Sequence, residues 1–109
     1  MNPEIKTRWV EALRSGKYIQ GSNALRYLTA DKEEHWCCLG VLCDLVAPKA
    51  WVAPVGLPRR FSHLDGADGM PSAGVRDAAD LPPRQAQDLA RLNDEGYSFE
   101  DIAKEIEKL

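Results

Sequence analysis

The sequence predicts an α+β fold, mainly helical, in a single domain that spans residues 1–109. Apolar residues recur at helical spacing in four separate stretches, which indicates that helices form most of the core. Two shorter stretches carry strand and turn signals and predict one or two small β-hairpins. The length suits one domain, and a hydrophobic content of 44% is enough for one core.

The N-terminal residues 3–15 predict the first helix. Asn2 is a good N-cap, and Pro3 suits the first helical position because its missing N–H is not needed there. Trp9 and Leu13 lie four residues apart and therefore share one face of this helix.

The predicted β-hairpins lie at residues 24–37 and 50–64. The charged run 31–34 separates the first pair of strands, and a proline-bounded turn separates the second pair. The glycine- and aspartate-rich run 65–69 predicts a surface loop, and residues 72–79 predict a short helix.

The central element is a buried helix at about residues 37–47. It lies in the densest apolar run of the chain, and Pro48 ends it. At 100° per residue one wide face is apolar, while Cys37, Gly40 and Asp44 form a narrower stripe of small or polar side chains. Gly40 allows another group to approach the backbone closely, so we expect any site to lie along this stripe.

A C-terminal helical hairpin is predicted at about residues 83–109, with Ser98 as the N-cap of its second helix. The segment 89–103 also looks like the opening of a helix-turn-helix, which suggests a DNA-binding regulator as one alternative function. However, a recognition helix must follow that segment, and the remaining helix is acidic and would be repelled by phosphate. We therefore expect a hairpin that closes the core.

Charge and composition exclude several classes of protein. The net charge is −3, which argues against a general nucleic-acid binder. Residues 1–26 carry five Lys/Arg and two Glu, whereas residues 77–109 carry four Lys/Arg and nine Asp/Glu. These ends either attract each other or leave a basic patch for a small anionic ligand. No apolar run is long enough to cross a membrane, no secretory signal is present, and three free cysteines suit a reducing compartment, so we expect a cytoplasmic protein.

Cys37 is the candidate catalytic residue if the protein is an enzyme. A helix N-terminus lowers a thiol pKa, and His35 or His63 would serve as the base of a small cysteine-dependent hydrolase or transferase. The alternative, which we favour, is a buried thiol that acts as a small apolar side chain. Because a regular helix points Cys38 and Cys43 to different faces, no metal site is expected, and no glycine-rich loop indicates a nucleotide cofactor.

Four blocks of sequence resemble a group of small proteins encoded by tailed phages and prophages. These blocks are residues 9–18, the pair Gln20-Gly21, the run Cys-Cys-Leu-Gly-Val-Leu-Cys-Asp-Leu at 37–45, and the pattern Leu-Asn-Asp-x-Gly-x-Ser-Phe-x-x-Ile-Ala at 92–103. The resemblance implies a phage origin and a setting in the host cytoplasm, but not a mechanism.

The resembling blocks contain polar residues that core packing does not require. If the central helix packs against the turns near residues 17–26 and 93–98, these residues converge with Cys37 on one pocket. The candidate ligand-binding residues are therefore Gln20, Arg26, Cys37, Gly40, Asp44, Asn93 and Asp94. The alternative is that they cap helices and satisfy buried turns.

The function we expect is that of a non-enzymatic phage accessory protein. It would bind a host protein or a small nucleotide-like ligand, for example to blunt a host defence. The oligomeric state stays open.

Overall fold

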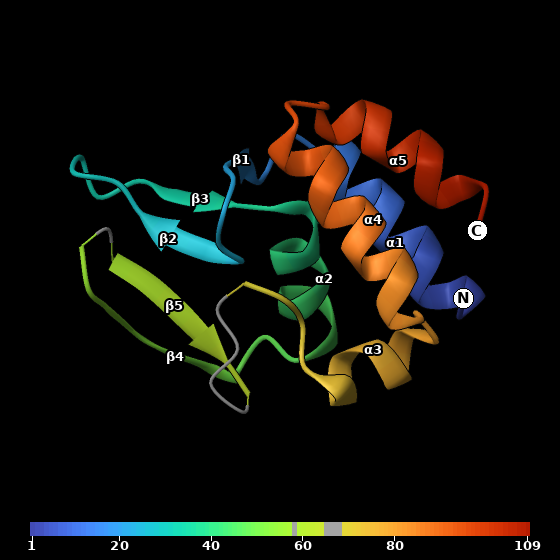
Figure 1. Ribbon diagram of the computed structural model, residues 1–109, viewed down its shortest axis with the longest axis horizontal. Coiled ribbons are helices and arrows are strands. Elements are labelled where there is room, and N and C mark those ends of the chain that lie inside the picture. The colour runs from blue at the N-terminus through green and yellow to red at the C-terminus, as the bar shows by residue number, and fades with distance from the viewer. Residues whose placement is uncertain (58, 65–68) are drawn as a thin grey trace.

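The structure is a computed structural model that describes residues 1–57, 59–64 and 69–109. These residues form five helices gathered at one end and a five-stranded sheet at the other (Figure 1). The predicted α+β class is confirmed. The surface loop predicted at 65–69 lies, except for Gly69, outside the described residues.

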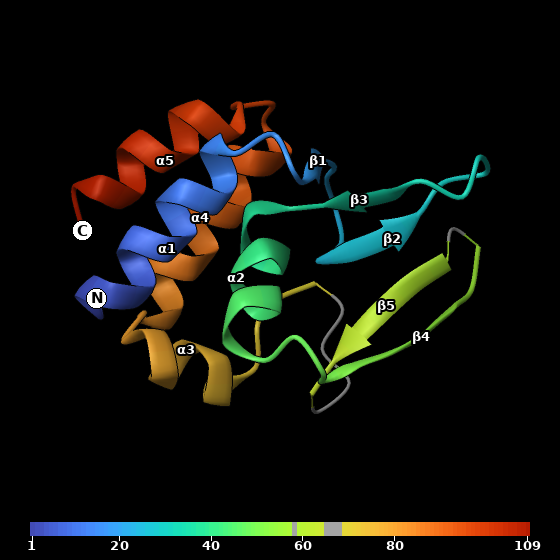
Figure 2. The same cartoon turned by 180° about the vertical axis from the view of Figure 1, so that it is seen from behind.

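One helix lies between the sheet and the other four helices, and both chain ends lie at the helical end (Figure 2). The outer helices are α1 (Pro3–Arg14), α3 (Ala73–Ala79), α4 (Pro83–Asp94) and α5 (Phe99–Glu107). The predicted caps form: the Asn2 side chain accepts from Ile5 N at 3.0 Å, and Ser98 Oγ accepts from Asp101 N at 3.1 Å. The local signals for helix ends were therefore sufficient to place the starts of α1 and α5.

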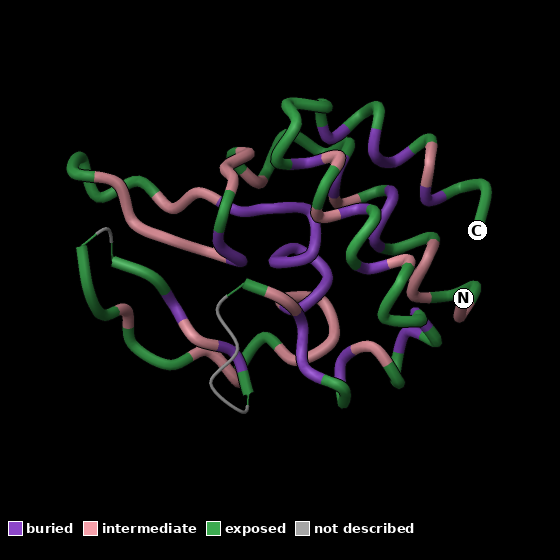
Figure 3. Tube along the Cα trace, in the orientation of Figure 1, coloured by how far each residue is buried: buried purple, intermediate pink, exposed green. Residues whose placement is uncertain are grey.

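Helix α2 (Cys38–Val46) is the predicted central helix, and Cys37 is its N-cap. Its first six residues, Cys38 to Cys43, are all buried. Purple marks the buried part of this helix in Figure 3. Trp9 Nε1 on α1 donates to the Cys38 carbonyl at 2.9 Å, so α1 is joined to the first turn of α2 by an indole hydrogen bond as well as by packing.

The expectation that the stripe on α2 is open to a ligand is wrong at Gly40. A Cβ atom placed on Gly40 would lie 1.8 Å from the carbonyl oxygen of Leu25. The close approach that glycine allows is therefore used by the chain's own backbone.

The predicted hairpins form, but they are parts of one sheet. Strands β2 (Arg26–Leu28) and β3 (Glu34–Trp36) are antiparallel, as are β4 (Trp51–Val55) and β5 (Arg59–His63). Antiparallel pairing of β2 with β5 joins the hairpins, and β1 (Ile19–Gln20) pairs in parallel with β3. The strand order is β1-β3-β2-β5-β4, so β4 is an edge strand. A strand of two residues is too short to produce an alternating pattern in the sequence, and β1 was therefore not predicted.

The C-terminal hairpin predicted at about 83–109 is confirmed as α4 and α5. Helix α5 buries Phe99, Ile102 and Ile106, and its main partner is α1. The apolar face of α5 is thus part of the core, and Glu100 and Asp101 lie exposed at its N-terminus. Among the described residues no helix has the length and apolar character needed to cross a bilayer.

Candidate functional site

Cys37, the candidate nucleophile, has a buried thiol. The residue is 5% exposed, and its Sγ accepts a hydrogen bond from Gly40 N at 3.4 Å. Burial raises the pKa of this thiol to about 11, because desolvation of the thiolate outweighs the backbone N–H groups at the helix end. The thiol is therefore protonated near neutral pH and unsuited to nucleophilic attack.

Neither candidate histidine is hydrogen-bonded to Cys37 in the part of the chain that the structure describes. His35 Nε2 lies 3.5 Å from a carboxylate oxygen of Glu33. His63 is fully buried, and its Nε2 lies 2.9 Å from the carbonyl oxygen of Ala47 at the end of α2. Both histidines have other partners, which argues against a Cys–His catalytic pair.

Gln20, which is half-buried, and Asn93, which is buried, form a polar junction between β1, α2 and the α4–α5 turn. Asn93 Oδ1 accepts from Cys38 N at 3.2 Å, and its Nδ2 donates to the Gly21 carbonyl at 2.7 Å. Gln20 Nε2 donates to Asn93 and to the Tyr97 carbonyl, while its Oε1 accepts from the N–H of Phe99 at 3.0 Å. These side chains satisfy backbone groups at helix ends, which is the alternative role considered from the sequence.

Asp94 and Cys37 lie on a different surface from Arg26 and Asp44. Asp94 accepts from the backbone N–H of Asn23 at 3.1 Å and, with Cys37, lines an open pocket of about 320 Å³. Arg26 and Asp44 line a separate open pocket of about 500 Å³. The seven predicted residues therefore do not converge on one pocket, and that expectation is wrong.

Arg26 lies within a cluster of aromatic rings on the sheet. Its guanidinium carbon is 3.8 Å from the centre of the Phe61 ring, 4.6 Å from Trp36 and 5.2 Å from Trp51. Arg26 also forms a salt bridge with Glu34 across the β2–β3 pair. The aromatic contacts and the salt bridge stabilise the Arg26 guanidinium, which is largely withdrawn from solvent.

Asp44 joins this aromatic cluster to α2. Its carboxylate accepts from Tyr18 Oη at 2.7 Å and from Trp51 Nε1 at 3.0 Å. The pKa of Tyr18 is raised to about 12, mainly by burial and in second place by its hydrogen bond to Asp44. The charges that line the pocket balance, because Lys17 and Arg26 are matched by Glu34 and Asp44. That balance does not favour an anionic ligand.

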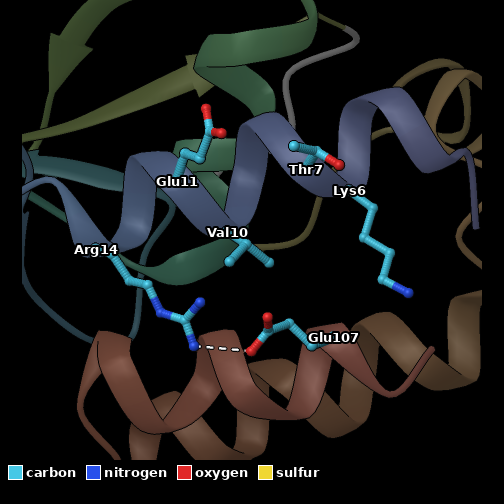
Figure 4. Close-up of a pocket in the computed structure, with 6 residues that line it drawn as sticks. All are labelled: Lys6, Thr7, Val10, Glu11, Arg14 and Glu107. Atoms are coloured by element: carbon cyan, nitrogen blue, oxygen red, sulfur yellow. Dashed lines mark hydrogen bonds and ion pairs between the residues drawn. The ribbon is translucent and has the colours of Figure 1, made fainter.

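A third pocket lies between α1 and α5, with a volume of about 360 Å³ (Figure 4). Arg14 crosses it and binds Glu107 at 2.8 Å and Glu100 at 2.9 Å. Lys6 donates to the carbonyl of Leu109 at 2.6 Å. Lys6 and Arg14 are therefore occupied by partners within the chain, which is the first of the two alternatives that the opposite charges of the chain ends left open.

The edge strand β4 and the turn after it expose apolar side chains. Val52, Val55 and Leu57 are 54%, 69% and 98% exposed. Val52 pairs with Ser62 and Val55 with Arg60, so two residues of β4 lie opposite the single residue Phe61. This β-bulge places Val52 and Val55 on the same face, although strict alternation would separate them.

This surface was missed because strand order cannot be read from a hairpin signal. A hairpin sequence does not say which of its strands is at the edge of a larger sheet. One signal was present: residues 45–64 contain Lys49, Arg59 and Arg60 but no acidic residue, in a chain of net charge −3.

The fold and these clusters define a small α+β protein with a helical core, a polar junction that is structural, and an apolar, basic sheet edge. The chain belongs to the family described as a domain of unknown function (DUF8296), whose family profile matches residues 1–82. That match contains the whole sheet and ends before α4. No curated protein matches the chain, and no solved structure does.

Proposed function

We propose that this protein is a non-enzymatic accessory protein of phage or prophage origin that binds a host protein in the host cytoplasm. The observation that carries the proposal is the exposed apolar surface formed by Val52 and Val55 on β4 and by Leu57 in the turn after it. Apolar side chains that cluster on an edge strand are typical of a protein-binding surface. The phage setting is supported by the resemblance of the four sequence blocks.

A small nucleotide-like ligand is the second candidate, and the pocket at Arg26 and Asp44 is the observation in its favour. Its volume of about 500 Å³ suits a small molecule. Its balanced charges and the salt bridge between Arg26 and Glu34 leave little net attraction for phosphate. We therefore rank protein binding first.

Affinity capture from a lysate of the host bacterium tests the proposal. The tagged protein is compared with the double variant Val52→Asp and Val55→Asp, and with the control Ile19→Asp. Ile19 is 46% exposed and lies on β1, at the other edge of the sheet, so the control makes one apolar-to-aspartate change of the same kind away from β4. Circular dichroism checks that all variants fold.

We expect a host protein to be retained by the parent and the Ile19 variant and lost by the β4 variant. Equal retention by all three proteins would contradict the proposal. Native mass spectrometry of the captured sample provides the second readout, since a retained small molecule that Arg26→Ala removes would favour the ligand candidate instead.

A further inference from the structure

We propose that β4 binds an extended acidic segment of the partner protein, which adds to the sheet as a further strand. The inference rests on the proposed function and specifies the surface and the chemistry of the partner. Three features of the described residues carry it: the free edge of β4, the apolar face beside that edge, and the basic residues around it.

Among the described residues, β4 pairs with another strand on one side only, although its Pro54 carbonyl also accepts from Arg59 Nη2 at 3.3 Å. It is the last strand in the order β1-β3-β2-β5-β4, and the hydrogen bond from Leu64 N to the Ala50 carbonyl at 3.2 Å extends its ladder with β5. In an antiparallel pair, alternate residues direct their N–H and C=O groups away from the partner strand. On β4 these groups point toward a position where another strand can bind, which is the geometry of β-strand addition. Pro54 carries no N–H and limits how many bonds the edge can donate.

The apolar face of β4 provides a surface for the side chains of an added strand. The β-bulge at Ala53 and Pro54 keeps Val52 and Val55 on one face, and both are more than half exposed. Side chains of neighbouring strands contact each other across a sheet at about 5 Å. We therefore infer that alternate side chains of the incoming segment are apolar and cover these two valines.

The charge of the β4–β5 hairpin selects an acidic partner. Lys49, Arg59 and Arg60 are exposed, and none of them forms an ion pair within the described ranges 1–57, 59–64 and 69–109. Arg60 pairs in register with Val55 and so lies beside the apolar face. An incoming strand that alternates apolar and acidic residues places its apolar side chains on the face of Val55 and Arg60 and its carboxylates on the opposite face, on the side of Arg59. The carboxylates therefore attract Arg59 most directly, and they attract Lys49 and Arg60 through the positive field of the hairpin as a whole.

The same charges disfavour a second copy of the chain as the occupant. Pairing of β4 with β4 of another copy would bring two basic hairpins together, and like charges across an interface cost binding energy. A nucleic acid would meet the basic residues, but it would leave the valines uncovered and would approach a chain of net charge −3.

Titration of the full-length protein with a short peptide of alternating glutamate and valine tests the inference. Binding is followed by amide chemical shifts and by hydrogen exchange, and we expect new protection at β4. Three comparison probes are used: the same peptide with lysine in place of glutamate, the glutamate peptide N-methylated at alternate residues, and a single-stranded oligonucleotide. Methylation removes the donors needed for strand pairing but keeps the charge.

We expect the lysine and N-methylated peptides to bind at least about tenfold more weakly than the glutamate peptide, and added salt to weaken binding. Arg60→Glu should weaken binding by about tenfold as well. The control Lys104→Glu makes the same charge change on the exposed face of α5 and should leave affinity unchanged.

The inference is overturned if the N-methylated peptide binds as well as its parent, if the lysine peptide or the oligonucleotide binds better, or if sedimentation shows a dimer that Val55→Asp dissolves. If the peptide does not bind but capture from lysate still depends on Val52 and Val55, strand addition is rejected and the proposed function is kept. If the peptide binds but the β4 variant retains the host protein as well as the parent does, the proposed function is rejected.

Discussion

Replacing Gly40 by alanine tests whether the contact between α2 and the chain before β2 determines the stability of this protein. Alanine in place of a helical glycine normally stabilises a helix by about 0.5–1 kcal/mol. At Gly40 the new Cβ would lie 1.8 Å from the Leu25 carbonyl oxygen and 2.6 Å from its carbonyl carbon, and both are backbone atoms. We therefore expect the opposite sign.

The expected loss of stability follows from the shift between α2 and Leu25 that the new Cβ requires. To bring this Cβ to an ordinary contact distance, α2 and Leu25 must separate by more than about 1 Å. That shift strains the hydrogen bond from Cys37 N to the Leu25 carbonyl, which is 3.1 Å long and buried. Overpacking costs about 1–3 kcal/mol, and a buried backbone pair left unsatisfied costs about 1–3 kcal/mol more. After the helix gain of about 0.5–1 kcal/mol is subtracted, we expect Gly40→Ala to lower the free energy of unfolding by about 1–5 kcal/mol, a large part of the stability of a small domain.

Urea unfolding followed by circular dichroism measures this change. The matched control is Gly74→Ala in α3, where the new Cβ would meet Ser72 Oγ at 3.8 Å and nothing nearer among the residues that the structure describes. This control should unfold at the same urea concentration as the parent protein or at a higher one. If Gly40→Ala is as stable as Gly74→Ala, the close approach of α2 to Leu25 is not a feature of the folded protein.

Three further predictions concern Asn93 and Cys37. Asn93→Ala should lower the free energy of unfolding by about 2–4 kcal/mol, because it leaves the N–H of Cys38 and the carbonyl of Gly21 without this partner. Cys37→Ser should keep the protein folded and change its stability by less than about 1 kcal/mol, since serine is a better N-cap than cysteine. Alkaline pH should destabilise the protein: the unfolded chain loses the Cys37 proton near pH 9 and the folded chain near pH 11, so stability is lost as the pH rises through this range. Urea midpoints measure all three, at neutral pH for the variants and across pH 8–11 for the parent.

The controls for these predictions are on the same elements. Glu95→Ala, on the exposed turn beside Asn93, should change stability by less than about 0.5 kcal/mol. An equal loss in both variants would show that the Asn93 hydrogen bonds add nothing. The Cys37→Ser variant should lose less stability than the parent above pH 9. If the free energy of unfolding of this variant and of the parent falls equally with rising pH, the fall is due to Tyr18 and the other buried thiols, whose pKa values are also raised by burial.

The helices were predicted well because their signals are local. Caps such as Asn2 and Ser98 and the spacing of apolar residues act within one or two turns. The hairpins were predicted from alternation and turn residues, which are also local. Their union through β2 and β5 depends on two segments about thirty residues apart in sequence, and no local signal specifies that pairing.

The candidate site was predicted less well, for a related reason. The sequence selected polar residues that core packing does not require, and the structure gives most of them hydrogen-bond partners. The sequence could not show that Asn93 would accept from the N–H of Cys38 at the start of α2, or that Asp44 would accept hydrogen bonds from Tyr18 and Trp51. The partners of a buried polar group come from other elements, so its role is fixed only when those elements pack.

Sequence alone determined the helical core, the buried central helix and the free thiols, because these depend on apolar content and spacing. Only the tertiary structure decided that Gly40 contacts the chain's own backbone, that the thiol of Cys37 is desolvated, and that Val52 and Val55 share the open face of an edge strand. Each of these depends on which distant segment lies alongside, and that choice is made by the packing of the whole chain.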